Sequence, residues 1–217
     1  LHEISSAARR GRELVRQILA FSRQQPLART PVCPDAIVTE TCSLLRTAIG
    51  SNVQLVKEVA PNGHAILADP TRLGQVLLNL GTNAVHALQG QPGRIRFRIY
   101  TDGPDDQAQP TALLETCRRS GLGAVRIAVS DNGCGMDEAT RARIFEPFFT
   151  TKRVGQGTGL GLPMVLGIVE AHGGAITVES RAGEGSTFTL YFPATADKPP
   201  APESVPEVVF ADGGTMA

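Results

Sequence analysis

The 217-residue sequence has no tryptophan and only two tyrosines, and it lacks an excess of either charge. Lysine plus arginine and aspartate plus glutamate number 21 each. A domain that binds nucleic acid electrostatically shows a basic patch and a basic balance. The composition therefore argues against nucleic acid as a partner.

Long apolar runs and paired cysteines are also missing. No stretch approaches the roughly 18 apolar residues of a membrane span, and the N-terminus lacks the three-part pattern of a signal peptide. The four cysteines have neither CxxC spacing nor neighbouring histidines, which indicates reduced thiols in the cytoplasm. The first residue is not methionine, so we interpret the sequence as a soluble fragment, and the full-length protein has room for a membrane anchor.

What the sequence does contain is a glycine-rich stretch, Gly155-Gln-Gly-Thr-Gly-Leu-Gly-Leu162, shortly after the turn Asp131-Asn-Gly-Cys-Gly-Met136. Alternate glycines let backbone N–H groups surround an anion, and a helix that starts near Leu160 adds a partial positive charge. This pattern predicts a phosphate cradle. It lacks the Lys-Ser/Thr of a P-loop and the spacing of a dinucleotide fingerprint.

The first 26 residues predict a single helix, from Glu3 to Gln24, that ends before Pro26. Its apolar or small residues alternate spacings of three and four, as in a coiled coil: Ile4, Ala7, Gly11, Leu14, Ile18 and Phe21. The alternative is a surface helix that lies on the main domain.

Residues 27–194 predict one domain in which strands and helices mix without regular βαβ alternation. Strands are expected at 28–32, 53–59, 65–68, 94–100, 124–130, 175–180 and 186–192, and helices at 35–49, 70–87, 111–119, 137–144 and 160–171. Asp69 and Pro70 begin the second helix as N-cap and first residue. The expected fold class is α/β, a two-layer sandwich with helices on one face of a mixed sheet.

Residues 195–217 change character. Lys198-Pro-Pro-Ala-Pro-Glu-Ser-Val-Pro206 has the composition of a stiff linker, and Val208-Val-Phe-Ala211 begins like a buried strand. We interpret this end as either the opening of a further domain, such as a receiver, or a disordered terminus.

Four motifs stand in a fixed order: Leu77-Leu-Asn-Leu-Gly-Thr-Asn-Ala84, Asp131-Asn-Gly-Cys-Gly135, Phe145-Glu-Pro-Phe-Phe149 and Gly155-Gln-Gly-Thr-Gly-Leu-Gly161. This order resembles the N, G1, F and G2 boxes of the sensor histidine kinases. Those kinases belong, with gyrase, Hsp90 and MutL, to a superfamily with the Bergerat-type ATP-binding fold. The resemblance covers roughly residues 28 to 193, and it implies ATP and Mg²⁺ as cofactors.

The resemblance assigns adenine recognition to Asp131, whose carboxylate accepts a hydrogen bond from the exocyclic amine that guanine lacks. Such a charge-assisted bond is worth about 1.5 to 3 kcal/mol. Gly133 and Gly135 are expected to let the backbone approach the base. The alternative for Asp131 is a solvated aspartate in an Asx-turn.

On the helix predicted at 70–87, Asn79, Asn83 and His86 form a polar stripe beside the apolar face. The resemblance makes Asn83 the Mg²⁺ ligand and places His86 near phosphate. Lys152, between the F and G2 motifs, is a candidate phosphate partner. Each has a simpler alternative, which is a satisfied or solvated polar side chain.

The remaining candidates follow from the same resemblance. Ser186 or Thr187 corresponds to the hydroxyl that reaches adenine through water, and the sequence leaves the choice open. Phe145, Phe148 and Phe149 are expected to anchor the loop rather than to contact the nucleotide. The nucleotide site is expected to include these residues of the glycine-rich stretch: Gly155, Gly157, Thr158, Gly159, Leu160, Gly161 and Leu162.

One absence bears on mechanism. In the ATPase branches a glutamate one turn before the metal asparagine activates water, whereas this sequence has Asn79, which is not a base. Positioning and charge neutralisation suffice for transfer to an external nucleophile.

The function implied is transfer of the γ-phosphoryl group to a histidine on a dimerising helical hairpin of the same kinase, with relay to a response-regulator receiver. We interpret residues 1–26 as the second hairpin helix, with the acceptor upstream; His2 is the weaker candidate. The alternatives are an ATP-driven clamp of the gyrase or MutL kind and a nucleotide sensor without transfer.

Overall fold

The structure is a computed structural model that describes residues 28–60, 64–107, 109–152 and 157–197. The helix predicted at 3–24, His2, the turn at 61–63, Gly155 and the residues from 198 onward lie outside these ranges. Among the described helices, none combines the length and apolar character needed to cross a bilayer.

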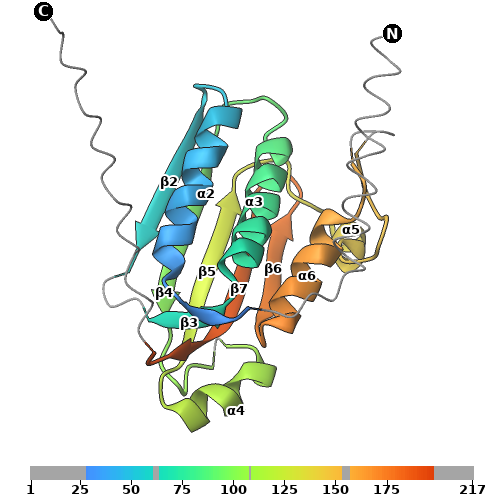
Figure 1. Ribbon diagram of the computed structural model, residues 1–217. Coiled ribbons are helices and arrows are strands. Elements are labelled where there is room, and N and C mark those ends of the chain that lie inside the picture. The colour runs from blue at the N-terminus through green and yellow to red at the C-terminus, as the bar shows by residue number, and fades with distance from the viewer. Residues whose placement is uncertain (1–27, 61–63, 108, 153–156, 198–217) are drawn as a thin grey trace, which may run out of the picture.

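A seven-stranded sheet organises the domain (Figure 1). The strand order is β1-β3-β7-β5-β4-β2, and β6 pairs with the other side of β7. The only parallel pair in this sheet is β2 with β4; the other described pairs are antiparallel. The strands are β1 Thr30–Val32, β2 Val53–Val59, β3 Ala65–Ala68, β4 Gly93–Thr101, β5 Ala124–Asp131, β6 Ala175–Arg181 and β7 Gly185–Thr195.

Three helices cover one face of the sheet: α2 (Pro34–Ala48), α3 (Pro70–Ala87) and α6 (Gly161–Ala171) (Figure 1). The core lies between these helices and alternate residues of the strands, because successive side chains of a strand point to opposite faces. The structure confirms the two-layer α/β sandwich, and every element predicted between residues 28 and 192 is present within a few residues of its expected bounds.

The start of α3 forms as the sequence predicts. The Asp69 carboxylate accepts a hydrogen bond from the backbone N–H of Arg72 at 3.1 Å, and Pro70 is the first helical residue. Residues three and four apart then face the core, with Leu73, Val76, Leu77 and Leu80 at 2% exposure or less. The capped start and the apolar face together fix how far α3 extends along the sheet.

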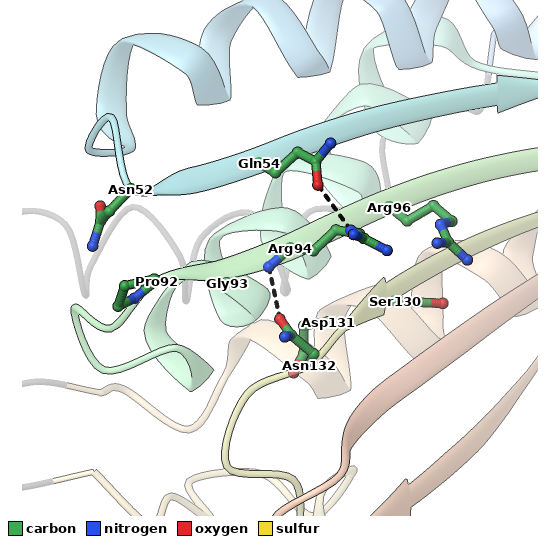
Figure 2. A pocket seen from close by; sticks show the side chains of 9 residues that line it. All are labelled: Asn52, Gln54, Pro92, Gly93, Arg94, Arg96, Ser130, Asp131 and Asn132. Atoms are coloured by element: carbon green, nitrogen blue, oxygen red, sulfur yellow. Dashed lines mark hydrogen bonds between the residues drawn. The ribbon is translucent and has the colours of Figure 1, made fainter.

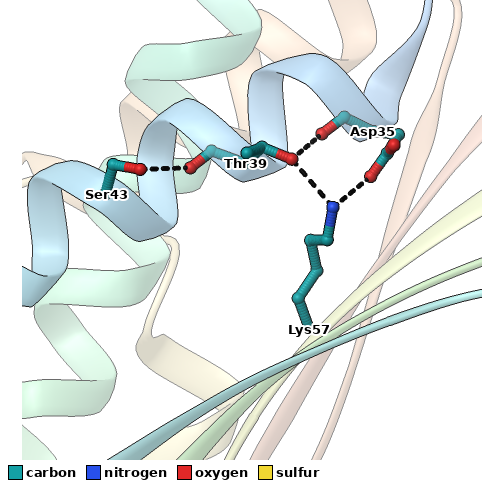
Figure 3. A network of polar contacts seen from close by, with 4 residues as sticks. All are labelled: Asp35, Thr39, Ser43 and Lys57. Atoms are coloured by element: carbon teal, nitrogen blue, oxygen red, sulfur yellow. Dashed lines mark hydrogen bonds and ion pairs between the residues drawn. The ribbon is translucent and has the colours of Figure 1, made fainter.

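The edge strand β2 is held to α2 by polar contacts (Figure 3). The Lys57 ammonium lies 2.6 Å from a carboxylate oxygen of Asp35 and 2.8 Å from the hydroxyl of Thr39. Asp35 also lies in the first turn of α2, where a negative charge is favoured. Because all three side chains are partly exposed, this link positions β2 more than it stabilises the fold.

The long connection between β4 and β5 carries the predicted helix, α4 (Thr111–Ser120). Leu113 and Cys117 of α4 pack against Tyr191, on the face of the sheet opposite α2, α3 and α6. Beside them Arg126 stacks on Tyr100, with 4.1 Å between its guanidinium carbon and the ring centroid, and pairs with the buried Asp102. The insertion therefore covers one end of this second face.

The last turn of α6 is joined to the first turn of α3 by His172, whose exposed fraction is 5%. The His172 Nε2 atom accepts a hydrogen bond from the backbone N–H of Asp69 at 3.0 Å, and Nδ1 lies 2.7 Å from the Ile168 carbonyl oxygen. These partners require a neutral ring with its proton on Nδ1. His172 is therefore a structural residue that connects two helices.

We expect His172→Ala to lower the free energy of unfolding by about 2 to 4 kcal/mol, because it leaves a cavity and removes the acceptor of the Asp69 N–H. Urea unfolding should show a lower midpoint with an unchanged slope. The exposed His86→Ala variant, as control, should change stability by less than about 0.5 kcal/mol. Equal effects of the two substitutions would show that the His172 contacts contribute nothing.

Candidate active site

One border of α3 carries the three predicted polar residues. Asn79 and Asn83 are half-buried and His86 is exposed. The Asn79 amide donates a hydrogen bond to the carbonyl oxygen of Gln75 at 3.0 Å, so it bonds within its own helix. Its side-chain oxygen faces the start of α6, where a Cβ added at Gly161 would lie 3.4 Å away. The polar border of α3 therefore faces the end of the glycine-rich stretch.

The loop after β5 packs on the C-terminal end of the same helix. The backbone N–H of Cys134 donates to the carbonyl oxygen of Ala87 at 3.0 Å. A Cβ added at Gly133 would lie 2.5 Å from this oxygen, and one at Gly135, whose φ is +61°, would lie 1.8 Å from the carbonyl oxygen of Arg181. Our expectation that these glycines make room for the base was therefore incomplete, because both are required by contacts within the protein.

Asp131 ends β5 on the face that carries the helices. Its carboxylate accepts a hydrogen bond from the Gly133 N–H at 2.9 Å, and the Ser186 N–H lies near enough to favour its charged form. Burial raises the pKa of the Asp131 carboxyl above its ordinary value, and the two backbone N–H groups partly oppose this rise. Asp131 thus makes the Asx-turn hydrogen bond of the alternative interpretation, to the N–H group two residues on, but its side chain is half-buried and not fully solvated. A carboxylate has about four acceptor positions, so it can accept further hydrogen bonds.

The structure distinguishes the two hydroxyl candidates on β7. Ser186 pairs with Asp131 in register, is 7% exposed, and has its hydroxyl 3.0 Å from that of Ser180. Thr187 points to the opposite face, where its hydroxyl donates to that of Ser130 at 3.0 Å. Ser186 therefore lies beside Asp131 and Thr187 does not. The sequence analysis missed Ser180, whose hydroxyl also accepts from the Met136 N–H at 2.9 Å and supports this loop.

Lys152 comes to the middle of the α3 border. Its ammonium lies 3.0 Å from His86 Nδ1 and 3.5 Å from the side-chain oxygen of Asn83. Desolvation by burial lowers the pKa of Lys152. Partial desolvation of the otherwise exposed ring, and then the neighbouring Lys152 charge, lowers the pKa of His86. The side-chain oxygen of Asn83 thus already faces a cation.

The F motif and the glycine-rich stretch are joined at their ends. The Phe148 N–H donates to the Gly159 carbonyl oxygen at 2.9 Å, and a Cβ at Gly159, whose φ is +66°, would lie 2.3 Å from the Phe148 backbone. A Cβ added at Gly157 would instead meet side-chain atoms of Thr150 and Lys152, at 2.7 and 3.1 Å. Glycine is therefore required at Gly159, where the obstacle is backbone and φ is positive, whereas at Gly157 the neighbouring side chains could move.

The start of α6 follows immediately. Its N-cap, Leu160, offers no side-chain hydrogen bond to the first turn, and the Thr158 hydroxyl accepts from the Leu160 N–H at 3.4 Å. Leu160 is buried and Leu162 packs on the core, so both position this helix end through apolar contacts. The first N–H groups of a helix have no intrahelical acceptor and attract anions.

The three phenylalanines differ in environment. Phe145 packs on the core as expected, and Phe149 is half-buried beneath the Arg143 guanidinium, 4.3 Å from its ring centroid. Phe148 is 67% exposed and has a φ of +67°. The prediction that Phe148 anchors the loop is therefore wrong. Its strained backbone instead allows the bond to Gly159.

The four motifs therefore converge on one border of α3, although residues as far apart in the chain as Asn79 and Gly161 are involved. The hydrogen-bonded carboxylate of Asp131 lies at one end of this border, and the Asn83 amide oxygen and the Lys152 ammonium lie in the middle. The start of α6, which has no side-chain cap, lies at the other end. A carboxylate can select an amine-bearing ring, and a helix start with a lysine can hold phosphate groups. Within the described ranges, no three His, Cys, Asp or Glu side chains gather as a metal site.

Residues 68–196 match the family model described as "Histidine kinase-, DNA gyrase B-, and HSP90-like ATPase". The chain is 37% identical over 182 residues to the signal transduction histidine-protein kinase AtoS of Escherichia coli K12, a match that spans 83% of this chain and 26% of AtoS. It therefore spans about a quarter of the length of that relative.

Solved structures agree with this match. The catalytic domain of histidine kinase ThkA superposes with a TM-score of 0.59 and 31% identity, over 76% of this chain and 95% of that domain. Full-length ShkA in complex with AMPPNP gives a TM-score of 0.69 and 30% identity, over 86% of this chain and 36% of ShkA. ThkA in complex with the response regulator TrrA gives a TM-score of 0.66 and 28% identity, over 88% of this chain and 49% of the ThkA chain. The chain belongs to the family of histidine kinase-, DNA gyrase B- and HSP90-like ATPases, and to the histidine kinases within it.

Proposed function

We propose that this chain binds ATP with Mg²⁺ and is the catalytic part of a two-component sensor kinase. It transfers the γ-phosphoryl group to a histidine on a helical hairpin, from which a receiver aspartate takes it. The observation that carries the proposal is the convergence of Asp131, Asn83, Lys152 and the start of α6 on one border of α3. The residues 27–194 form the catalytic domain in this proposal.

Adenine recognition falls to Asp131. The base takes the position at the end of β5, where the carboxylate has acceptor capacity left beside its bond to the Gly133 N–H and the nearby Ser186 N–H. The neighbouring Ser186 hydroxyl is the group that reaches adenine through water. Along the same border, His86 lies towards the base and Asn79 lies beside the start of α6, at the end proposed for the phosphate groups.

The phosphate groups take the other end of this border. The N–H groups at the start of α6 and the Lys152 ammonium are the donors for them. The side-chain oxygen of Asn83 fits a magnesium ion as an oxygen ligand, and in this proposal the Lys152 ammonium, 3.5 Å from that oxygen, turns to the phosphate groups when the metal binds. When bound, Mg²⁺ supplies charge neutralisation for the transferred group, and Asn83 is the residue of this chain that holds it.

Among the described residues, the site lacks the glutamate base that the ATPase branches carry one helical turn before the metal asparagine. Asn79 stands where a base is needed, and its amide is engaged with the Gln75 carbonyl oxygen. Phosphoryl transfer depends mainly on positioning and on charge stabilisation. The chain therefore suits transfer to an imidazole brought by another element better than hydrolysis.

The partners in this proposal are a helical hairpin of the same kinase dimer and a receiver domain. The structure of ThkA with the response regulator TrrA supports the second, because the two catalytic domains share their fold. Residues 1–26, in this proposal, are the second hairpin helix.

We expect Asn83→Ala to remove the magnesium-dependent part of ATP binding. Isothermal titration calorimetry of the wild type should show tighter binding with Mg²⁺ than with EDTA, and Asn83→Ala should bind with the EDTA affinity in both buffers. Thr82→Ala, on the same helix, is the matched control, because the Thr82 hydroxyl bonds only to the carbonyl oxygens of Leu78 and Asn79. A full magnesium effect in Asn83→Ala would exclude Asn83 as the metal ligand.

A further inference from the structure

The face of the sheet opposite α2, α3 and α6 carries a row of arginines on β4. Ile95, Phe97 and Ile99 point into the core, so Arg94, Arg96 and Arg98 alternate with them on the opposite face. We call this side of the sheet the open face. The insertion with α4 covers only its far end, next to Tyr191.

These arginines are short of carboxylate partners. Arg96 and Arg98 share the single carboxylate of Glu58, with N–O distances of 3.3 and 4.0 Å. These ion pairs run through the Nε atoms of the two arginines, which are buried and are not aligned for a hydrogen bond with Glu58. The Arg94 Nε donates to the neutral side-chain oxygen of Gln54 at 2.9 Å (Figure 2). A guanidinium has five N–H donors, so the three arginines have more charged N–H donors than these acceptors can occupy.

Arg94 and Arg96 line a cavity of about 550 Å³ at the end of this row (Figure 2). The size is that of a site for a small molecule. Its other polar walls are the amides of Asn52, Gln54 and Asn132 and the hydroxyl of Ser130. Such walls suit a ligand with polar groups and not an apolar one.

The cavity is separate from the candidate active site, although Asp131 also forms part of its wall. Ser130 pairs in register with Arg96 on the open face, whereas the next residue, Asp131, directs its carboxylate to the helix side. Asn132 lies between the two sites, and its side-chain oxygen accepts from the Arg94 backbone N–H at 2.7 Å.

We propose that this cavity is a second ligand site, for a small organic phosphate whose anionic group binds Arg94 and Arg96. Phosphate oxygens match the planar fork of a guanidinium, and they replace the neutral Gln54 acceptor with a charged one. The amide and hydroxyl walls bind the rest of the ligand. The site does not depend on ATP binding.

The experiment is an NMR titration of ¹⁵N-labelled protein with pyrophosphate, at constant ionic strength and without Mg²⁺. We expect saturable shifts at residues 93–96 and 130–132. Arg94→Gln should weaken this binding about tenfold or more, since a hydrogen bond to a charged group is lost. Arg118→Gln changes the net charge equally but lies on α4, where Arg118 pairs with the exposed Asp105, and it should bind as the wild type does. Lys152→Gln separates the two sites, because it should leave the shifts at residues 93–96 unchanged.

Three results would overturn the proposal. Shifts confined to α3 and the start of α6, and lost in Lys152→Gln, would mean that pyrophosphate binds only the active site. Equal weakening in Arg94→Gln and Arg118→Gln would mean a non-specific charge effect. If pyrophosphate gives no saturable shifts while a short glutamate peptide gives them at residues 93–96, the open face binds an acidic protein segment instead.

Discussion

The 217-residue chain incubated alone with γ-labelled ATP should form almost no phosphohistidine. A complete helical hairpin with its acceptor histidine, added in trans or fused upstream, should raise the label about a hundredfold or more. The reason is that a docked hairpin holds the histidine in position next to the γ-phosphate, whereas a free histidine reaches it only by random collision. The adduct should be acid-labile and base-stable. The measurement is autoradiography after gel electrophoresis with acid and base treatment.

This expectation rests on where the described histidines lie. His172 is buried and both of its ring nitrogens have partners. His86 lies on α3 beside Lys152, within the site proposed to hold the phosphate groups and not opposite it. His64 is half-buried just before β3. No described histidine is therefore placed to attack in line.

Three outcomes would contradict this account. Label on His2 of the chain alone would make the first helix the acceptor helix. Rapid ATP turnover by the chain alone would favour a clamp of the gyrase or MutL kind, despite Asn79. No transfer even with the hairpin would favour a nucleotide sensor.

Asp131→Asn should weaken ATP binding by about 10- to 150-fold, the equivalent of about 1.5 to 3 kcal/mol for a hydrogen bond to a charged group. The fold should be retained, because the asparagine oxygen can still accept from the Gly133 N–H. Calorimetry should also show that the wild type prefers ATP to GTP and that the variant has lost this preference. Asp105→Asn, an exposed carboxylate near α4, is the control for charge.

The raised pKa of Asp131 gives this prediction a pH dependence. ATP affinity should fall as the pH drops through that pKa, because the protonated carboxyl is a weaker acceptor. Stability of the nucleotide-free protein should change in the opposite sense. A folded-state pKa above the unfolded one makes a contribution that is complete below the unfolded pKa and is lost as the pH rises through the folded one. Asp131→Asn should abolish both effects, and wild-type protein that binds ATP and GTP equally would refute the assignment.

The sequence predicted the elements of the domain because their signals are local. Asp69 with Pro70 identified the start of α3, and alternating apolar residues identified β2 and β4. The residues of the site were predicted by the order of four motifs, but their grouping was not. It depends on contacts such as Lys152 with Asn83, which are 69 residues apart in the chain.

Other features required the packed structure. The face of β7 that carries Ser186 is set by the register with Asp131, and no local signal separates it from Thr187. The contact of Gly133 with Ala87 and the exposure of Phe148 likewise arise from how distant segments meet. The open face could not be recognised either, because alternate arginines on one strand are equally typical of a solvated surface.

The contacts at the C-terminal end of α6 make this end the pivot for any tilt of the helix. There the Arg29 guanidinium, just before β1, donates to the Ala171 carbonyl oxygen, and His172 holds the start of α3. The 11-residue helix is about 16 Å long, so a tilt of 5° about this end displaces its first residue by about 1.4 Å. A small rotation where the chain enters the domain would therefore shift the proposed phosphate-binding end of α6 by about half the length of a hydrogen bond.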